Sequence, residues 1–288
     1  MTAATDPDTA AAAVRRATAY LAERGVESPR ASAEALVMAA LGTDRAGIYA
    51  RRGPVPADRA AWLDEAIRRR GEGVPLQHLT GQTTFLGLSL VVRPGVFVPR
   101  PETEVVALAA IDVIPRRPGA IVVDVGTGAG AIALAVKAAR PAAEVWATDV
   151  SEAATTLARE NATRLGLDVR VAMGDVLEPV PASLRGGIDL LVSNPPYLRA
   201  EDHPSLPPEV RADPYQALVG GTQLHRRLAQ EAPRWLRPGG WLVLEIGDDQ
   251  ADGVASLLAA AGLTDVTVGA DLTGRARLVR GRSPDGDP

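Results

Sequence analysis

Four consecutive residues, Asn194-Pro195-Pro196-Tyr197, carry the most specific chemistry in the sequence. Each proline fixes its own φ, lacks an N–H donor and pushes the residue before it toward an extended conformation. The Asn194 side chain and the Pro195 carbonyl therefore form a rigid pair of hydrogen-bond acceptors that can hold both hydrogens of an –NH2 group. Such a pair can orient a delocalised nitrogen toward an electrophile and stabilise the charge that develops on it. All four are candidate catalytic residues, with Tyr197 as a flat face against a planar amide or aryl amine.

A glycine-rich segment upstream could bind a cofactor. Gly126-Thr127-Gly128-Ala129-Gly130 follows an apolar run and precedes a helical pattern. Glycines let the chain turn tightly and let a ligand approach the backbone, and the N-terminus of a helix presents free N–H groups to that ligand. The candidate cofactor contacts are Gly126, Thr127, Gly128 and Gly130, together with Asp124 just before the loop.

Acidic residues follow the next two expected strands. Asp149 lies 23 residues after Gly126, where a carboxylate can accept both hydroxyl hydrogens of a ribose. Asp175 ends the third strand, in position to contact an adenine. Val150 and Val176 follow these two acids and complete the predicted nucleoside side of the site, and Asn194 is counted as a further cofactor contact.

The glycine loop alone fits more than one ligand. With Ala131 as its last small residue it also satisfies the dinucleotide fingerprint, and a tight turn without any ligand is a third interpretation. A dinucleotide needs a cradle for its pyrophosphate, whereas S-adenosylmethionine carries a sulfonium and an amino-acid end. Asp124 suits the cationic ligand better, and the Asn194–Tyr197 segment supplies a place for a methyl acceptor. The residues therefore favour S-adenosylmethionine, with S-adenosylhomocysteine as the product.

An alternation of short apolar strands and helices must position these motifs. This pattern is typical of βαβ units on a parallel sheet covered on both faces, so we predict an α/β, doubly wound, Rossmann-like methyltransferase sheet. The expected strands are 121–125, 144–148, 168–173, 188–193, 241–246, 265–269 and 276–280, and the expected helices are 129–139, 151–165, 223–236 and 248–261.

Three segments are expected along the chain. Residues 1–83 show helical spacing of apolar residues and predict a small helical bundle domain, which either stabilises the protein or docks a partner. Residues 84–98, interrupted by Gly87 and by Pro94-Gly95, predict a β-hairpin linker. Residues 99–288 then form the catalytic domain.

Composition excludes several classes of protein. The net charge is −4, and neither part of the chain is strongly basic, which argues against a nucleic-acid substrate. There are no cysteines, and the three histidines, His78, His203 and His225, have no metal-ligand spacing, so we expect neither thiol chemistry nor a metal site. The N-terminal region has no apolar stretch long enough for a signal or a membrane span, so we expect a cytoplasmic protein without membrane contact.

Further segments resemble one family. Asn194–Tyr197 is similar to a motif shared by methyltransferases of glutamine amides, adenine amines and guanine amines. Pro75–Gly81, Val98–Glu104 and Leu244–Gly247 narrow this resemblance to the release factor glutamine methyltransferases of the PrmC/HemK type (protein N5-glutamine methyltransferases). The resemblance covers about residues 20–280, and Val98–Glu104 is its most particular segment.

The resemblance implies N5-methylation of the glutamine side chain in the Gly-Gly-Gln motif of peptide-chain release factors. It implies that residues 1–83 dock the release factor and that Asn194 and the Pro195 carbonyl hold the glutamine amide. Arg100 and Thr103 would lie near the methionine end of the cofactor, or would only hold the linker in place. A monomer that makes no direct contact with nucleic acid is expected.

The chain departs from the family pattern after Val219-Gly220-Gly221. No acid precedes the two glycines, and Thr222–His225 is about three residues shorter than usual. Because this loop is expected near the substrate, the acceptor stays open. A relative that methylates a small amine, amide or guanidine is one alternative; a nucleic-acid amino-group methyltransferase and a catalytically inactive binding module are others.

Overall fold

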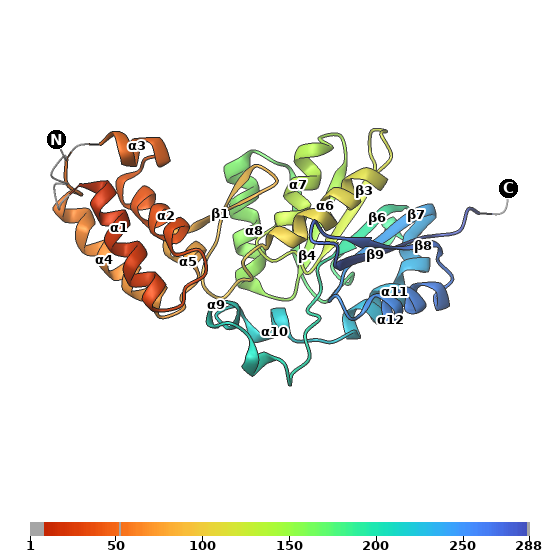
Figure 1. Ribbon diagram of the computed structural model, residues 1–288. Helices are drawn as coiled ribbons and strands as arrows, with labels where there is room; N and C mark the ends of the chain where they lie inside the picture. The colour runs from red at the N-terminus through yellow and green to blue at the C-terminus, as the bar shows by residue number, and fades with distance from the viewer. Residues whose placement is uncertain (1–8, 52, 287–288) are drawn as a thin grey trace. The chain divides into compact units, whose positions relative to one another are not determined.

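The computed structural model describes residues 9–51 and 53–286, which divide into two compact units. The first unit runs to Gln82 and also includes Leu206–Ala212. The second comprises Thr83–Ser205 and the chain from Asp213 onward. Figure 1 labels most elements of both units.

The first unit is helical. Its core is made of small and aliphatic side chains, including Leu21, Leu36 and Ile48, each with no exposed surface. Thr9 caps the first helix, because its hydroxyl accepts the N–H of Ala12 at 3.2 Å. The helices are α1 (Ala10–Glu23), α2 (Pro29–Leu41), α3 (Arg45–Ala50), α4 (Ala57–Gly71) and α5 (Leu76–Thr80).

A short segment distant in sequence belongs to this helical unit. Leu206–Ala212 contains the single-turn helix α9 (Pro208–Arg211). Arg70, only 6% exposed, forms an ion pair with Glu209, with 2.6 Å between Nη1 and Oε2. Because a buried guanidinium needs a partner, this ion pair ties the segment to α4.

The second unit is built on a seven-stranded sheet in the order β5-β4-β3-β6-β7-β9-β8. The first five of these strands pair in parallel, and β9 pairs antiparallel with both β7 and β8. This confirms the predicted doubly wound α/β fold. The strands are β3 (Ile121–Val125), β4 (Glu144–Asp149), β5 (Val169–Met173), β6 (Ile188–Ser193), β7 (Leu236–Glu245), β8 (Thr264–Ala270) and β9 (Ala276–Arg282).

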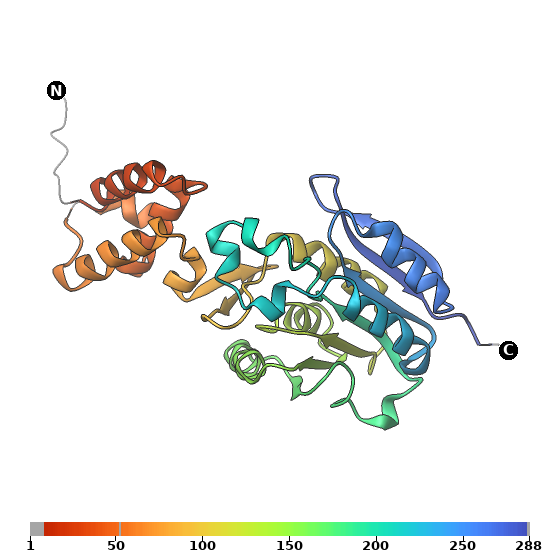
Figure 2. The ribbon, with the colours of Figure 1, turned by 90° about the horizontal axis from the view of Figure 1, so that it is seen from below.

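Helices cover both faces of the sheet, as Figures 1 and 2 show. Alternate residues of β3 point to opposite sides: Val122 packs in the cluster with α6 and α7, and Val123 packs in the cluster with α11 and α12. The central strands are therefore buried on both faces and read as mainly apolar runs. The helices of this unit are α6 (Pro101–Val113), α7 (Ala131–Ala139), α8 (Glu152–Leu165), α10 (Tyr215–Leu218), α11 (Gln223–Trp235) and α12 (Ala251–Ala260).

Several elements differ from the sequence-based expectation, including strand β7, which begins at Leu236 and not at residue 241. The hairpin is confined to β1 (Gln82–Phe85) and β2 (Leu88–Val91), so the remainder of the predicted linker 84–98 is not strand. Helix α6 was not predicted. Pro101 occupies the first turn of this helix, where its missing N–H costs nothing. Within the described residues, no helix is long and apolar enough to cross a membrane.

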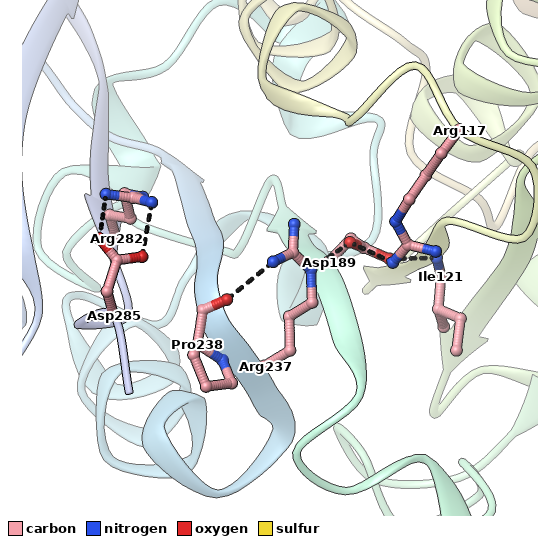
Figure 3. A network of polar contacts seen from close by, with 7 residues as sticks. All are labelled: Arg117, Ile121, Asp189, Arg237, Pro238, Arg282 and Asp285. Carbon is pink, nitrogen blue, oxygen red and sulfur yellow. Dashed lines mark hydrogen bonds and ion pairs between the residues drawn. The ribbon is translucent and has the colours of Figure 1, made fainter. Parts of the chain in front are cut away.

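A buried acid holds the amino ends of the sheet strands together (Figure 3). Asp189, in β6, accepts two contacts from Arg117 Nη2 at 2.9 Å and the backbone N–H of Ile121 at 2.8 Å. Arg237 also donates to it. The carboxylate is completely buried and both guanidiniums are partly exposed. This network fixes β3 against β6 at the end opposite to the candidate site.

Candidate active site

The glycine loop and the Asn-Pro-Pro-Tyr segment leave the sheet side by side. They follow β3 and β6, which are neighbours, and Val125 pairs with Ser193 at the last position of each strand. The Ser193 hydroxyl donates to the Val125 carbonyl at 2.6 Å, which fixes the two exits to each other. The strand order reverses at β3, and ligands of open α/β sheets bind at such a switch point.

The glycine loop has the geometry of a cradle. Gly126 and Gly128 have φ of +71° and +56°, which L side chains rarely adopt. A Cβ at Gly126 would come no nearer than 4.0 Å to another atom, and one at Gly128 would meet nothing within 4 Å. Gly130 differs, because its Cβ would lie 3.0 Å from Leu134 Cδ1 and would clash with the packing. The first two glycines thus open space for a ligand, and the third allows α7 to pack.

Asp124 is the buried anchor of this loop. Its Oδ2 accepts the Thr127 hydroxyl at 2.7 Å and the Ala133 N–H at 3.1 Å. Its Oδ1 is buried and has no hydrogen-bond partner in the described structure. Burial raises the pKa of Asp124 to about 7. A cationic ligand nearby would therefore be stabilised by the ionised form of this carboxyl.

Asp149 lies beside the loop at the end of β4. Its Oδ2 accepts the Gly128 N–H at 2.9 Å and its Oδ1 accepts the Ser151 N–H at 2.9 Å. Each carboxylate oxygen has a second lone pair, so it can still accept a hydroxyl hydrogen. Val150, which follows, is 63% exposed although it is apolar. An exposed apolar side chain next to a carboxylate matches a nucleoside, whose base needs a nonpolar contact and whose ribose needs an acceptor.

Asp175 and Val176 follow the carboxyl end of β5, the strand next to β4. Asp175 makes a two-pronged contact with Arg227, at 3.0 and 2.8 Å, and both side chains are about half exposed. Val176 adopts a positive φ of +54°, and its carbonyl accepts the Thr148 hydroxyl at 2.8 Å. The strained backbone is therefore held from β4, one residue before Asp149.

Asn194 and Pro195 present free acceptors. The Asn194 Nδ2 donates to Thr103 Oγ1 at 3.0 Å. Within residues 9–51 and 53–286, no donor contacts Asn194 Oδ1 or the Pro195 carbonyl. The arrangement can therefore accept two hydrogens from one planar –NH2 group, which is the function that the sequence predicts for this pair.

Tyr197 is held from both ends. Gln250 Nε2 donates to its carbonyl at 2.8 Å, and its hydroxyl lies 3.5 Å from Glu245 Oε1. Burial and the nearby Glu245 carboxylate raise the pKa of the Tyr197 hydroxyl well above its usual value. Glu245 is absent from the predicted site residues. Two signals for it were present in the sequence: it is an acid at the end of the apolar strand β7, and it lies within Leu244–Gly247, one of the segments that resemble the family.

The Val98–Glu104 segment has structural partners of its own. Arg100 forms an ion pair with Asp213, whose carboxylate is completely buried and also accepts the Val98 N–H at 3.1 Å. Glu104 accepts the N–H of Leu86, in the hairpin turn, at 2.8 Å. Thr103 is the member of this segment that reaches Asn194. The structure thus brings Thr103 into the site and gives Arg100 a role in holding the loop that contains Asp213.

The loop after the Asn-Pro-Pro-Tyr segment closes over it. The backbone N–H of Leu198 donates to the Leu218 carbonyl at 2.9 Å, and the backbone N–H of Gly220 donates to the Leu198 carbonyl at 3.1 Å. A Cβ at Gly220 would lie 2.6 Å from the Pro196 carbonyl oxygen. The first glycine of Gly220-Gly221 is therefore required by this close approach.

Comparison with known proteins identifies two family models in the chain. They are the PrmC N-terminal domain, matched over residues 12–81, and the methyltransferase small domain, matched over residues 87–251. The release factor glutamine methyltransferase of Deinococcus radiodurans is 44% identical over 277 residues, which cover 94% of this chain and 97% of the relative. That of Moorella thermoacetica is 45% identical over 259 residues, which cover 87% and 88%.

Solved structures support the same fold. A methyltransferase from Pyrococcus furiosus superposes with a TM-score of 0.53 at 20% identity, over 80% of this chain and 100% of that chain. A 16S rRNA N2 G1207 methyltransferase from T. thermophilus gives a TM-score of 0.52, also at 20% identity, over 70% of this chain and 49% of that one. At this identity the likeness concerns the fold alone.

Proposed function

The chain belongs to the release factor glutamine methyltransferase family, and from this premise we propose that it methylates N5 of the glutamine side chain in the Gly-Gly-Gln motif of release factors. The methyl donor in this proposal is S-adenosylmethionine. The observation that carries the proposal is the adjacency of the glycine loop and the Asn194-Pro195 acceptor pair at the ends of β3 and β6.

The residues of the glycine loop and its neighbours fit this cofactor. Gly126 and Gly128 leave open space, and Asp124 has a buried oxygen without a partner, which suits a ligand that carries positive charge. Asp149 would accept the ribose hydroxyls. Thr127, Gly130, Val150, Asp175 and Val176 complete the proposed contacts, and Val150 supplies the apolar surface for the adenine.

The chemistry follows from the acceptor pair. The cofactor supplies a methyl group on a positively charged sulfur. Asn194 Oδ1 and the Pro195 carbonyl accept the two hydrogens of the glutamine –NH2, which turns the nitrogen toward the cofactor side and stabilises the charge that develops on it. The nitrogen then loses one of these hydrogens to water as a proton, so that no strong base is required. Tyr197 and Pro196 confine the planar amide.

The helical unit provides the proposed docking surface for the release factor. This unit matches the PrmC N-terminal domain over residues 12–81. Trp62 and Tyr49 are 39% and 47% exposed on this unit, and exposed aromatic side chains are common anchors of protein interfaces.

A methyl-transfer assay with labelled cofactor tests the proposal. Purified release factor and the same factor with its Gly-Gly-Gln glutamine changed to alanine are the two substrates. We expect label on the first only. Label on neither substrate, with cofactor bound by the protein, would contradict the proposal and favour a small amine, amide or guanidine acceptor.

A further inference from the structure

The side chain of Asn194 contacts Thr103, which in turn interacts with Glu245. The amide nitrogen of Asn194 donates to the Thr103 hydroxyl at 3.0 Å. The Thr103 hydroxyl also interacts with the Glu245 carboxylate and favours its ionised form. Thr103 and Glu245 are 3% and 2% exposed. The three residues come from α6, from the loop after β6 and from the end of β7, and none of their contacts is local in sequence.

The number of donor protons decides which of Glu245, Thr103 and Asn194 donates and which accepts. An ionised carboxylate only accepts hydrogen bonds, and a hydroxyl has a single proton to donate. If Thr103 gives its proton to Glu245, its oxygen can only accept from Asn194. The amide group of Asn194 must then turn its –NH2 toward Thr103. Its Oδ1 is consequently turned away from Thr103 and left free to accept.

Other groups around Glu245 act on its charge. Arg277, on β9, favours the ionised carboxylate, whereas Glu102, on α6, opposes it by like charge. The Tyr197 hydroxyl lies 3.5 Å from Oε1, and Oε2 is buried without a hydrogen-bond partner in the described structure. The backbone carbonyl of Glu245 is bonded to His225 Nε2 at 2.8 Å, which fixes the end of the strand.

We infer that Glu245 and Thr103 are positioning residues, which hold the Asn194 side chain with Oδ1 facing the acceptor amide. The inference rests on the proposed function, since the acceptor is taken to be a planar –NH2 group. We call the interactions that run from Glu245 through Thr103 to Asn194 the relay. Without the relay, the Asn194 amide can rotate by half a turn and present –NH2 to the substrate –NH2. Two donors then face each other, and that orientation cannot hold the acceptor.

Protonation of Glu245 would reverse the relay. A protonated carboxyl can donate to Thr103, and Thr103 can then donate to Asn194 Oδ1. Burial, with the like charge of Glu102, raises the pKa of Glu245 to about 7, while Arg277, Thr103 and Tyr197 act in the opposite direction. We therefore expect the kcat of the wild-type protein to fall as pH decreases through the pKa of Glu245. In Glu245→Gln, kcat should not show this fall.

The test compares three variants of the full-length protein. Thr103→Val keeps the shape and removes the hydroxyl, Thr103→Ser restores it, and Glu245→Gln keeps the volume and supplies a donor. Thr155→Val is the matched control, because Thr155 is equally buried and its hydroxyl bonds only the Glu152 carbonyl within α8. Three quantities are measured: kcat for methyl transfer to release factor, KM for the cofactor, and the side-chain amide proton resonances of Asn194 in 15N-labelled protein, assigned with Asn194→Asp.

We expect Thr103→Val and Glu245→Gln each to lower kcat by about 10- to 100-fold, less than the loss of a directly contacting group, with KM for the cofactor changed by less than about threefold. Thr103→Ser should recover most of the loss, and the Thr103→Val, Glu245→Gln double variant should be no slower than either single variant. Shifted Asn194 amide resonances in Thr103→Val, with none in Thr155→Val, would support the relay.

Wild-type kcat in Thr103→Val, or unchanged Asn194 resonances in that variant, would overturn the inference. The resonances do not depend on the acceptor. If the wild-type protein does not methylate release factor, the proposed function fails, and the orientation of Asn194 is still decided by the resonances.

Discussion

Gly220 is a position at which one added methyl group should disturb catalysis through geometry alone. A Cβ there would lie 2.6 Å from the Pro196 carbonyl oxygen and 3.0 Å from Pro196 Cγ. A carbon and an oxygen in contact normally lie at least about 3.2 Å apart, so Gly220→Ala must move the Asn-Pro-Pro-Tyr loop or its own loop by about 0.6 Å. Displacements approaching 1 Å at a reacting centre can cost about 100-fold in rate. We expect kcat to fall by about 30- to 100-fold.

The backbone of Gly220 does not need glycine for its φ, because Gly220 is not among the positive-φ residues. The expected loss is therefore steric, and overpacking should also lower the free energy of unfolding by about 1–3 kcal/mol. Gly253→Ala is the matched control: Gly253 lies within α12, and a Cβ there meets nothing within 4 Å.

The assay is single-turnover methyl transfer at saturating cofactor, with cofactor affinity measured by calorimetry. A Gly220→Ala protein with kcat within threefold of wild type would refute the reasoning, because it would mean that the loop absorbs the methyl group without moving Pro195. An equal loss in Gly253→Ala would show instead that the assay responds to any added methyl group.

Four further predictions concern single side chains. Asn194→Ala should lower kcat by about 100- to 1000-fold and leave cofactor affinity nearly unchanged, because it removes an acceptor at the reacting nitrogen; turnover and calorimetry measure the two effects. Asp149→Ala should weaken cofactor binding by at least about tenfold in calorimetry, because it removes the proposed acceptor for the ribose hydroxyls. Asp189→Asn should lower the free energy of unfolding by about 2 kcal/mol, and Tm by about 4–8 °C, because Arg117 and Arg237 lose a charged partner but keep access to water. The pKa of Asp124 rises from 3.8 to about 7 on folding, so its contribution to stability is complete below about pH 4 and is lost as pH increases through 7; Asp124→Asn should therefore flatten part of the decline in Tm of the cofactor-free protein between pH 5 and 8.

Each of these has a contradicting outcome. Unchanged turnover in Asn194→Ala would remove the account of amide positioning, and unchanged affinity in Asp149→Ala would remove the ribose assignment. Asp189→Asn with wild-type Tm would mean that the two arginines find equivalent partners elsewhere. For Asp124→Asn, a Tm that declines with pH as steeply as in the wild type would place the titrating group at another buried acid.

Local pattern was sufficient for most of the sheet. The predicted strands 121–125 and 188–193 coincide with β3 and β6, because strands buried on both faces read as mainly apolar runs, here with one acid each, Asp124 and Asp189. Helix α6 was missed for the converse reason. Its residues after Glu104 are mostly apolar, so the sequence there shows no continuous polar face. The signals that could have revealed its start are Pro101 and the acids Glu102 and Glu104 in the first turn.

The residue types and spacings of the two loops were enough to predict their chemistry, because the constraints of glycine and proline act within a few bonds. The partners that orient those loops were not predictable in this way. Thr103 lies 91 residues before Asn194, and Glu245 lies on another strand. Nothing in the local sequence around a threonine or a glutamate tells which distant amide it will meet, because that contact depends on the strand order and on how α6 packs against the sheet. The sequence by itself therefore predicted which groups hold the acceptor, and only the tertiary structure decided which groups contact Asn194.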